Sequence, residues 1–472
     1  MCQKKNNVIY VGADTKVSAA TTIQNFGNYS SVSDLQATVL RDTILNAEDT
    51  IKVSGTTWYV SNDGDDLNAG NSPETPWRTL NAITRNADKI KAGDAVLFKR
   101  GDIFRGKLTT VSNVSYGAYG EGDKPSIYGS KKNYANETWV RTENANVYSL
   151  RVDINTDIGM IIFNHGEAYG YKMLNSVSEC DSDYEFYHDV SNGIIYLYCS
   201  NGRPNQAFYD IEILYNQMAV QVSNGAENIY IENLAIKYTG AHGISVGMPV
   251  NNITIKNCEI GWIGGSIHKD DNTRYGNGIQ FYGQTTNAVV DHCWVYQCYD
   301  AGLTHQYTGA PDGNSEMTAE NITYTNNLVE FCTYSLEYFW NWKVNGVPTE
   351  NANVYMKDIL VEDNVMRFAG HGLGKTRPDP VNMGHVVTSM SYNSNENFVV
   401  KNNIFDMSAL RLFNVSTYTE ANPVFTGNQY IQSADKLLGD AYTENKTKGG
   451  RVALNAESLK RFDEFGTLVV VE

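Results

Sequence analysis

The sequence predicts an all-β chain folded as a parallel β-helix, a solenoid of stacked coils, with an antiparallel β insertion and a short helical N-terminal cap. Two observations carry this prediction. A segment with Asn or Asp, an apolar–x–apolar triplet and a polar pair recurs at spacings of 24 to 39 residues, opening at Asn228, Asn252, Asn287, Asn321, Asp358, Asn397 and Asn422. The shortest spacing fits one coil, and the longer ones fit a coil with an added loop. The 31 Tyr and 40 Gly beside only 10 Pro favour many short strands and turns.

Residues 1–55 precede the coils. Residues 32–48 have the pattern of an amphipathic helix, and we expect this helix to cover the open N-terminal end of the solenoid, where backbone groups would be unpaired. No apolar signal segment is visible near Met1. Met1 stands directly before Cys2 and a polar tail, as in a mature bacterial lipoprotein preceded by an added Met. This favours an extracytoplasmic protein whose signal has been removed.

Residues 56–130 are expected to form the first coils. They contain Tyr59-Val60-Ser61, a loop rich in Asn, Asp and Gly at 62–70, and Pro76-Trp77-Arg78-Thr79. In these motifs and in the later repeats the chain resembles bacterial right-handed parallel β-helix proteins of the pectin-lyase-like superfamily, from residue 56 to about 432. The resemblance implies a right-handed solenoid and a carbohydrate-active enzyme. It is specific for the fold and weak for the reaction.

Residues 131–227 interrupt the repeats. Alternating segments such as 193–200 and 208–215 are typical of antiparallel strands, so we expect an insertion packed beside the solenoid. Regular coils follow over 228–432. The polar tail over 433–472 is expected to cap the C-terminal end.

The polar pair of each repeat predicts a ladder inside the solenoid. Its second member falls where a tight turn needs a side chain that can bond the backbone. Stacked in coils about 4.8 Å apart, these side chains would form an internal polar ladder. Its members would be Asn233, Asn257, His292, Asn326, Asp363 and Asn402.

A second strand in each coil predicts where the site lies. If its Ile or Leu points into the solenoid, the next residue points outward, because strand side chains alternate. The outward row would be Ser245, Gln280, Thr304, Glu337, Gly374 and Arg411. Loops at 261–277, 307–320, 341–357 and 375–396 flank this strand and would border a groove, and function is expected on loops held by a rigid scaffold.

Glu337 is the first candidate for a catalytic acid, because it lies in this row near the middle of the coils. Hydrolysis of a glycosidic bond needs two carboxyl groups across the bond, at separations that side chains on neighbouring coils provide. Asp379, held stiffly between two Pro, is the expected partner, with Asp300 or Asp271 as substitutes. A solvated strand Glu and a surface Arg–Asp pair are the alternative interpretations.

Basic, polar and aromatic side chains around Glu337 would hold the sugar. These candidates are Arg377, Arg411, His371, Lys375, His305, Gln280, Trp340 and Trp342. Asp270 and Asp271 would form either a shared-proton pair or a Ca²⁺ site, with ordinary solvated loop residues as the alternative.

Composition narrows the function classes. Lys+Arg 37 against Asp+Glu 53 gives a net charge of −16, which argues against nucleic acid and anionic membranes as partners. The sequence contains no run of about 18 apolar residues, so it predicts no transmembrane segment. Seven Cys at this length do not resemble a disulfide scaffold.

Three functions remain open. The favoured one is hydrolytic cleavage of a polysaccharide or oligosaccharide, which requires no cofactor. The second is a polysaccharide lyase, in which Lys375, Arg377 or His371 abstracts a proton and Ca²⁺ neutralises a uronate. The third is a non-catalytic glycan-binding solenoid of the tailspike or adhesin type. The basic residues beside Glu337 favour an acidic or sulfated glycan in the first two cases.

Overall fold

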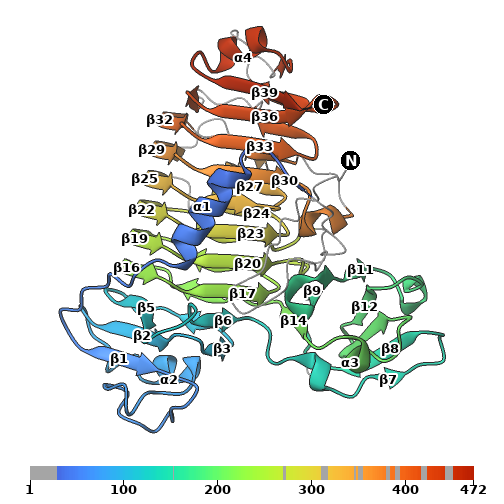
Figure 1. Ribbon diagram of the computed structural model, residues 1–472. Helices are drawn as coiled ribbons and strands as arrows, with labels where there is room; N and C mark the ends of the chain where they lie inside the picture. The colour runs from blue at the N-terminus through green and yellow to red at the C-terminus, as the bar shows by residue number, and fades with distance from the viewer. Residues whose placement is uncertain are drawn as a thin grey trace, which may run out of the picture.

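The computed structural model describes residues 29–152, 154–268, 273–309, 317–344, 347–348, 354–378, 383–388, 394–415, 423–441 and 450–471. These residues form a solenoid of stacked coils, with a separate lobe beside its N-terminal end (Figure 1). Three long sheets run along the solenoid, and their neighbouring strands are parallel except for the terminal pair β37–β38 and the short β27–β28 hairpin. The prediction of an all-β parallel β-helix is therefore confirmed.

The first sheet has ten strands. They are β1 (Thr57–Val60), β2 (Ala95–Lys99), β5 (Ser115–Tyr119), β16 (Glu227–Glu232), β19 (Val250–Lys256), β22 (Thr285–Asp291), β25 (Met317–Thr325), β29 (Val354–Glu362), β32 (Ser394–Lys401) and β35 (Val424–Thr426). The second sheet also has ten. They are β3 (Ile103–Arg105), β6 (Ser126–Tyr128), β17 (Ala235–Thr239), β20 (Glu259–Ile263), β23 (Trp294–Cys298), β26 (Leu328–Glu330), β30 (Val365–Ala369), β33 (Ile404–Ser408), β36 (Gln429–Ser433) and β39 (Thr467–Val471).

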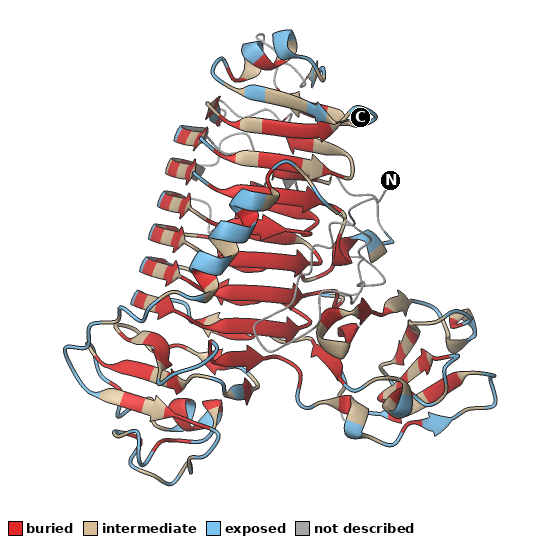
Figure 2. Ribbon diagram, in the orientation of Figure 1, coloured by how far each residue is buried: buried red, intermediate tan, exposed pale blue. Residues whose placement is uncertain are grey.

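The third sheet contains the second strand of each coil, on which the sequence analysis predicted the site. They are β4 (Leu108–Thr109), β15 (Val220–Val222), β18 (Ile244–Val246), β21 (Ile279–Tyr282), β24 (Ala301–Gly309), β27 (Tyr334–Val344), β31 (Gly384–Thr388), β34 (Arg411–Asn414), β37 (Leu437–Ala441) and β38 (Gly450–Val452), with β28 (Val347–Pro348) paired to β27. One coil passes through the three sheets in turn. Buried apolar residues of all three fill the interior (Figure 2).

The lobe is the predicted antiparallel insertion. One of its sheets has the order β11 (Tyr171–Met173), β12 (Glu185–Asp189), β13 (Ile194–Tyr198), β8 (Val147–Arg151) and β7 (Val140–Arg141). The other has the order β10 (Ala168–Tyr169), β9 (Ile158–Phe163) and β14 (Ile211–Tyr215). Most pairs in these sheets are antiparallel. The coils resume at Val220, because β15 pairs in parallel with β4 and β18.

Three helices outside the lobe have distinct places. Helix α1 (Asp34–Leu45) corresponds to the predicted amphipathic helix, but it lies along the second sheet and not over the end of the solenoid (Figure 1). Its apolar face packs on a cluster outside the second sheet that includes Trp294 and Phe331. The short helix α2 (Leu80–Arg85) contributes Leu80 and Ile83 to the interior of the first coils. Helix α4 (Ala456–Phe462) caps the C-terminal end, where the Phe462 ring stacks on Phe413 at 4.2 Å.

A buried charge network explains where α1 lies. The Glu330 carboxylate, with a fully buried side chain, accepts hydrogen bonds from Arg41 of α1 at 2.9 Å and from Arg367 of β30 at 3.1 Å. Arg367 also pairs with Asp34, and Asp406 accepts from Ser33 just before the helix. Buried charges are tolerated only when paired, so these contacts fix the helix to three successive coils. An amphipathic pattern predicts an apolar face but not the surface that this face covers.

We expect Glu330→Gln to lower the free energy of unfolding by about 2 to 3 kcal/mol, because Arg41 and Arg367 would lose a buried counter-charge. The measurement is the Tm together with amide exchange of α1. Glu457→Gln is the control, since Glu457 is 82% exposed in its pair with Arg461 and should change stability by less than about 0.5 kcal/mol. Equal Tm values for the two variants would contradict a structural role for the network.

The polar ladder exists one residue later than predicted. Asn326 and the equivalent second members of each pair have φ between 50° and 57°, a left-handed conformation that Asn, Asp and His tolerate better than other residues with a Cβ. The buried ladder is formed by the next residues, Asn327, Asn364, Asn403 and Asn428. Each accepts a hydrogen bond through Oδ1 from the backbone N–H of the preceding coil at 2.9 to 3.0 Å. Asp463 ends the ladder by accepting from Asn428.

Cysteines take the ladder position in two earlier coils, at Cys258 and Cys293. The six cysteines of the described residues are all buried free thiols. Within the described residues, no helix is long and apolar enough to cross a membrane.

Candidate active site

The third sheet has an outer row that contains the predicted members from Ser245 to Glu337. Strand register aligns Gln221, Ser245, Gln280, Thr304, Glu337, Val387, Asn414 and Asp440 on successive coils. The flanking residues of the same strands, such as Leu303 and Leu336, are in the interior cluster, so the row faces outward. The predicted continuation through Gly374 and Arg411 is wrong. Residues Leu373–Thr376 form a 3₁₀ turn, η4, outside the sheets, and the next strand starts only at Gly384.

Glu337 is a carboxylate in a row of mostly uncharged side chains. Its side chain is 6% exposed, so it is covered to a greater extent than a solvated strand Glu would be. Thr304 lies beside it on the preceding coil, where its hydroxyl donates to Gln306 Oε1 at 3.0 Å. Ala301 and Tyr334, at the starts of β24 and β27, form a small apolar cluster with Val387, the register partner of Glu337 on the next coil.

Asp300, directly before β24, forms an ion pair with Arg377, which follows η4. Arg377 Nη1 donates to Asp300 Oδ1 at 2.7 Å, and the guanidinium lies 5.6 Å from the centre of the Tyr299 ring. Both side chains are less than 20% exposed. Asp300 precedes Thr304, the register partner of Glu337, by four residues, which corresponds to roughly 13 Å along a strand. Asp300 is therefore too distant for a retaining pair with Glu337, for which about 5 Å is required.

Two of the expected sugar contacts lie inside the solenoid. His305 is 1% exposed, and its ring stacks with Tyr338 at 6.0 Å. Burial lowers its pKa to about 3, so the imidazole is neutral. Trp340 is 1% exposed within the interior cluster and contacts Tyr307. Neither side chain faces the outer row, because strand alternation turns His305, one residue after Thr304, and Trp340, three residues after Glu337, inward.

The expected basic cluster is divided among separate places. His371 faces Tyr29 before α1, with Nδ1 at 3.2 Å from the hydroxyl, and burial lowers its pKa to about 4. Arg411 pairs with Asp440 of β37. Lys375 is exposed at the end of η4. Gln280 lies in the outer row as expected and is 5% exposed. Of the four cations proposed to hold sugar, the structure brings Arg377 into contact with Asp300.

The remaining candidates lie outside the described part of the chain. These are Asp379, Asp270, Asp271 and the side chain of Trp342. Among the residues that the structure does describe, no group of three His, Cys, Asp or Glu side chains could hold a metal ion.

Two histidines that sequence reasoning did not select border the outer row. His242 lies three residues before Ser245, and its Nδ1 accepts from the Asn277 N–H at 3.1 Å. Burial lowers its pKa to about 3, so this acceptor stays neutral. The Tyr275 ring lies edge-on between His242 at 5.0 Å and His268 at 4.7 Å. The isolated His in each segment gave no spacing signal that would have marked this contact.

The lobe supports the loop that carries His268. Asp157 of the lobe accepts from the Ile267 N–H at 2.7 Å and pairs with Lys172. Lys172, Ile267 N–H and His188 all favour ionised Asp157, and they hold its pKa below the ordinary value despite burial. The insertion therefore holds the backbone of this loop at Ile267 through a buried contact.

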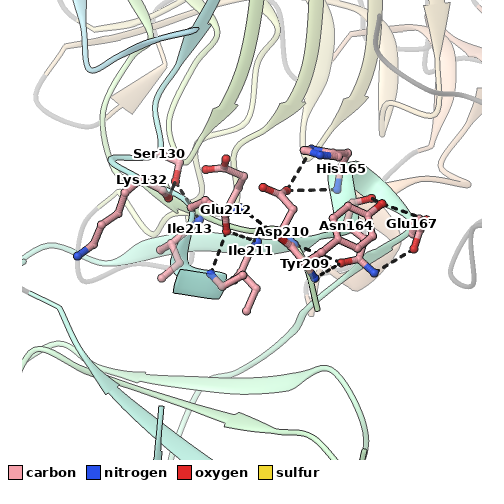
Figure 3. Close-up of polar contacts among 12 residues, drawn as sticks. Ser130, Lys132, Asn164, His165, Glu167, Tyr209, Asp210, Ile211, Glu212 and Ile213 are labelled. Atoms are coloured by element: carbon pink, nitrogen blue, oxygen red, sulfur yellow. Dashed lines mark hydrogen bonds and ion pairs between the residues drawn. The ribbon is translucent and has the colours of Figure 1, made fainter. Parts of the chain in front are cut away.

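A second polar cluster lies on the lobe itself, between β9 and β14 (Figure 3). Asp210 is 2% exposed and accepts from both the backbone N–H of His165 at 3.2 Å and the His165 ring, whose Nδ1 is 3.3 Å away. Beside it Glu212 pairs with Arg105 of β3 at 2.7 Å. Burial raises the pKa of Asp210 from an ordinary 3.8 to about 6, although His165 and Arg105 favour the ionised form. The sequence predicted an antiparallel strand at 208–215 but gave no functional signal at Asp210.

The raised pKa of Asp210 predicts a pH dependence of stability. Between about pH 4 and pH 6 the folded chain keeps a proton that the unfolded chain has released, so the free energy of unfolding falls as pH rises through this window. The full difference is about 3 kcal/mol. We expect Asp210→Asn to flatten this slope in urea unfolding followed at pH 4, 5 and 6. An unchanged slope would mean that other groups cause the dependence.

A known protein matches a short part of the sequence. No model of a known protein family matches the sequence. The lacto-N-biosidase of Bifidobacterium longum subsp. longum is 31% identical over 103 residues, which are 20% of this chain and 6% of that protein. The chain thus spans a small part of that relative's length.

Solved structures that are similar to this chain have low sequence identity and TM-scores below 0.5. The complex of XylC with xylose has a TM-score of 0.43 at 12% identity, covering 88% of this chain and 82% of that one. The GH136 lacto-N-biosidase from Eubacterium ramulus has a TM-score of 0.42 at 15% identity, covering 89% and 67%. PfbA, a surface adhesin of Streptococcus pneumoniae, has a TM-score of 0.34 at 11% identity, covering 77% and 83%. None of these likenesses assigns a reaction to the chain.

Proposed function

We propose that this chain cleaves glycosidic bonds of a polysaccharide or oligosaccharide by hydrolysis, on the outer row of the third sheet. The observation that carries the proposal is Glu337, a nearly covered carboxylate that follows the hydrogen-bonding side chains of Ser245, Gln280 and Thr304 on the preceding coils. Sugar hydroxyls need such donors and acceptors, and bond cleavage needs a positioned acid. The lacto-N-biosidase relative adds support from a fifth of the chain.

The second carboxyl is proposed to be Asp379, on the Pro-flanked segment that follows Arg377. Asp300 is the substitute, and its separation from Glu337 would suit an inverting reaction only if both side chains extend toward each other. In this proposal Arg377 holds Asp300 in place, and no cofactor is needed. A role for Ca²⁺ at Asp270 and Asp271 belongs to the lyase alternative.

The positions of the cations favour hydrolysis over elimination. A lyase needs a base beside the sugar and a positive charge on the uronate. Arg377 is paired with Asp300, and Arg411 is paired with Asp440. His371 contacts Tyr29 beside the second sheet. These contacts also favour a neutral sugar over an acidic or sulfated one at Glu337. We further propose an extracytoplasmic location, where such glycans occur.

The test is the mass of products after incubation with neutral, uronic-acid-bearing and sulfated glycans. Hydrolysis gives oligosaccharides that each carry one added water per cut. Unsaturated uronide products would replace the proposal with a lyase. If binding without products is found across the panel, with a folded sample, the chain is better described as a glycan-binding solenoid.

A further inference from the structure

Tyr209 is an exposed aromatic ring held in one place. It is 56% exposed. Its hydroxyl lies 3.2 Å from Glu167 Oε1, and its backbone N–H donates to Asn164 Oδ1 at 3.0 Å. Asn133 donates to its carbonyl oxygen at 3.1 Å. One contact through the hydroxyl and two through the backbone therefore hold this exposed ring in place.

The turn that holds Tyr209 is strained and anchored. Asn164, His165 and Gly166 have φ of 49°, 56° and 105°, three successive residues in the left-handed region. Such backbone persists only when its surroundings impose it, and it concentrates at functional sites. Gly166 packs directly on the Trp262 ring of β20, where an added Cβ would lie 2.3 Å from the ring. The turn is therefore seated on the solenoid itself.

The groups around the ring form a polar rim. Glu167 also accepts from the Asn164 side chain at 3.0 Å, and the His165 ring meets the Tyr209 ring edge-on at 5.6 Å (Figure 3). His165 is one-third exposed, and its Nδ1 is directed to the buried Asp210. A rigid Tyr surface beside a carboxylate and an imidazole can stack on the apolar face of a pyranose while its hydroxyls bond the rim.

We propose that this surface, formed by Tyr209, His165, Glu167 and Asn164, is a second glycan-binding site for one neutral pyranose residue. The charge of the rim selects a neutral sugar, because Glu167 would repel a uronate or sulfate, and the nearby Arg105 is already paired with Glu212. The surface packs against the second sheet through Trp262, whereas Glu337 lies on the third sheet. The inference therefore goes beyond the proposed hydrolysis and does not depend on it.

The test is saturation-transfer NMR of the full chain with methyl β-D-galactopyranoside, and with methyl β-D-glucuronopyranoside as the charged counterpart. We expect the neutral glycoside to bind with a Kd in the range of roughly millimolar, with saturation strongest on one face of its ring. Tyr209→Ala should reduce the signal about tenfold, whereas Tyr209→Phe, which keeps the ring, should retain most of it. Tyr187→Ala is the matched control, since Tyr187 is a half-buried lobe tyrosine that stacks on Tyr196.

Each outcome decides the proposal. Signal that persists in Glu337→Gln and is lost in Tyr209→Ala supports a separate site on the lobe. Signal lost in Glu337→Gln would place the sugar on the outer row and overturn the second site. So would equal signals from the wild type and a folded Tyr209→Ala, or no signal in the wild type. If Tyr209→Ala does not fold, Glu167→Gln replaces it, because the ring stays and the charged acceptor is removed; an unchanged signal there would also count against the site.

Discussion

Glu337→Gln is expected to lower turnover of the glycan substrate by about 10³-fold, within the range observed when a positioned acid or base is removed. The amide has nearly the same shape as the carboxyl, so the neighbours Thr304 and Val387 should keep their places. The change removes the proton that would be given to the leaving oxygen. The measurement is the initial rate of product formation with the most active glycan of the panel.

Two controls separate catalysis from folding. Glu320→Gln changes a half-buried strand Glu on β25 of the first sheet and should leave the rate within about twofold. Because Glu337 is 6% exposed, we also expect its variant to lose up to about 1 kcal/mol of stability, which a Tm measurement would show. Full activity in a folded Glu337→Gln would remove the assignment, and equal losses in both variants would indicate damage to the fold.

Asn364→Leu is expected to lower the free energy of unfolding by about 4 kcal/mol, since several buried polar groups would lose their partners at once. Asn364 Oδ1 accepts from the N–H and the side-chain amide of Asn327, both at 2.9 Å. Its own amide donates to the carbonyl oxygens of Tyr324 and Glu362 and to Asn403. Leu has the same branched arrangement of non-hydrogen atoms, so the main loss is of hydrogen bonds.

The matched control is Asn326→Gly, one residue before the ladder in the preceding coil. Asn326 is half-buried with φ of 52°, a conformation that Gly adopts freely, so we expect a change below about 1 kcal/mol. Urea unfolding of both variants, with amide exchange at coils β26 to β33, is the measurement. If Asn326→Gly were the more damaging of the two, the ladder would lie at the position that the sequence pattern first suggested.

The coils were predictable because their signal is repeated. Each coil places an apolar pair, a polar pair and a second strand at the same offsets, so an error in one coil is corrected by the others. The outer row was right through Glu337 for this reason. The predicted row failed at Gly374. The residue types from Gly372 to Lys375 resemble the start of the second strand in other coils. In the structure Leu373–Thr376 form a 3₁₀ turn, and Leu373 is buried outside the sheets.

Features that occur once in the chain could not be predicted in this way, because no repeated pattern supports them. Asn326 and Asn327 are chemically identical neighbours, and only the backbone conformation decides which one enters the ladder. His305 and Trp340 were assigned by residue type, although the alternation that directs Glu337 to the outer row turns both inward. The Tyr209 surface joins segments more than 40 residues apart through an irregular turn, for which the sequence contains no repeat.

The buried charge network of helix α1 also has a consequence for the order in which the chain can fold during synthesis. Its partners Glu330, Arg367 and Asp406 follow their N-terminal contacts by 289, 333 and 373 residues. At ribosomal rates, the helix would be made roughly 15 to 70 s before its buried counter-charges exist. Helix α1 therefore cannot form its buried polar contacts until the coils that carry Glu330, Arg367 and Asp406 have been made.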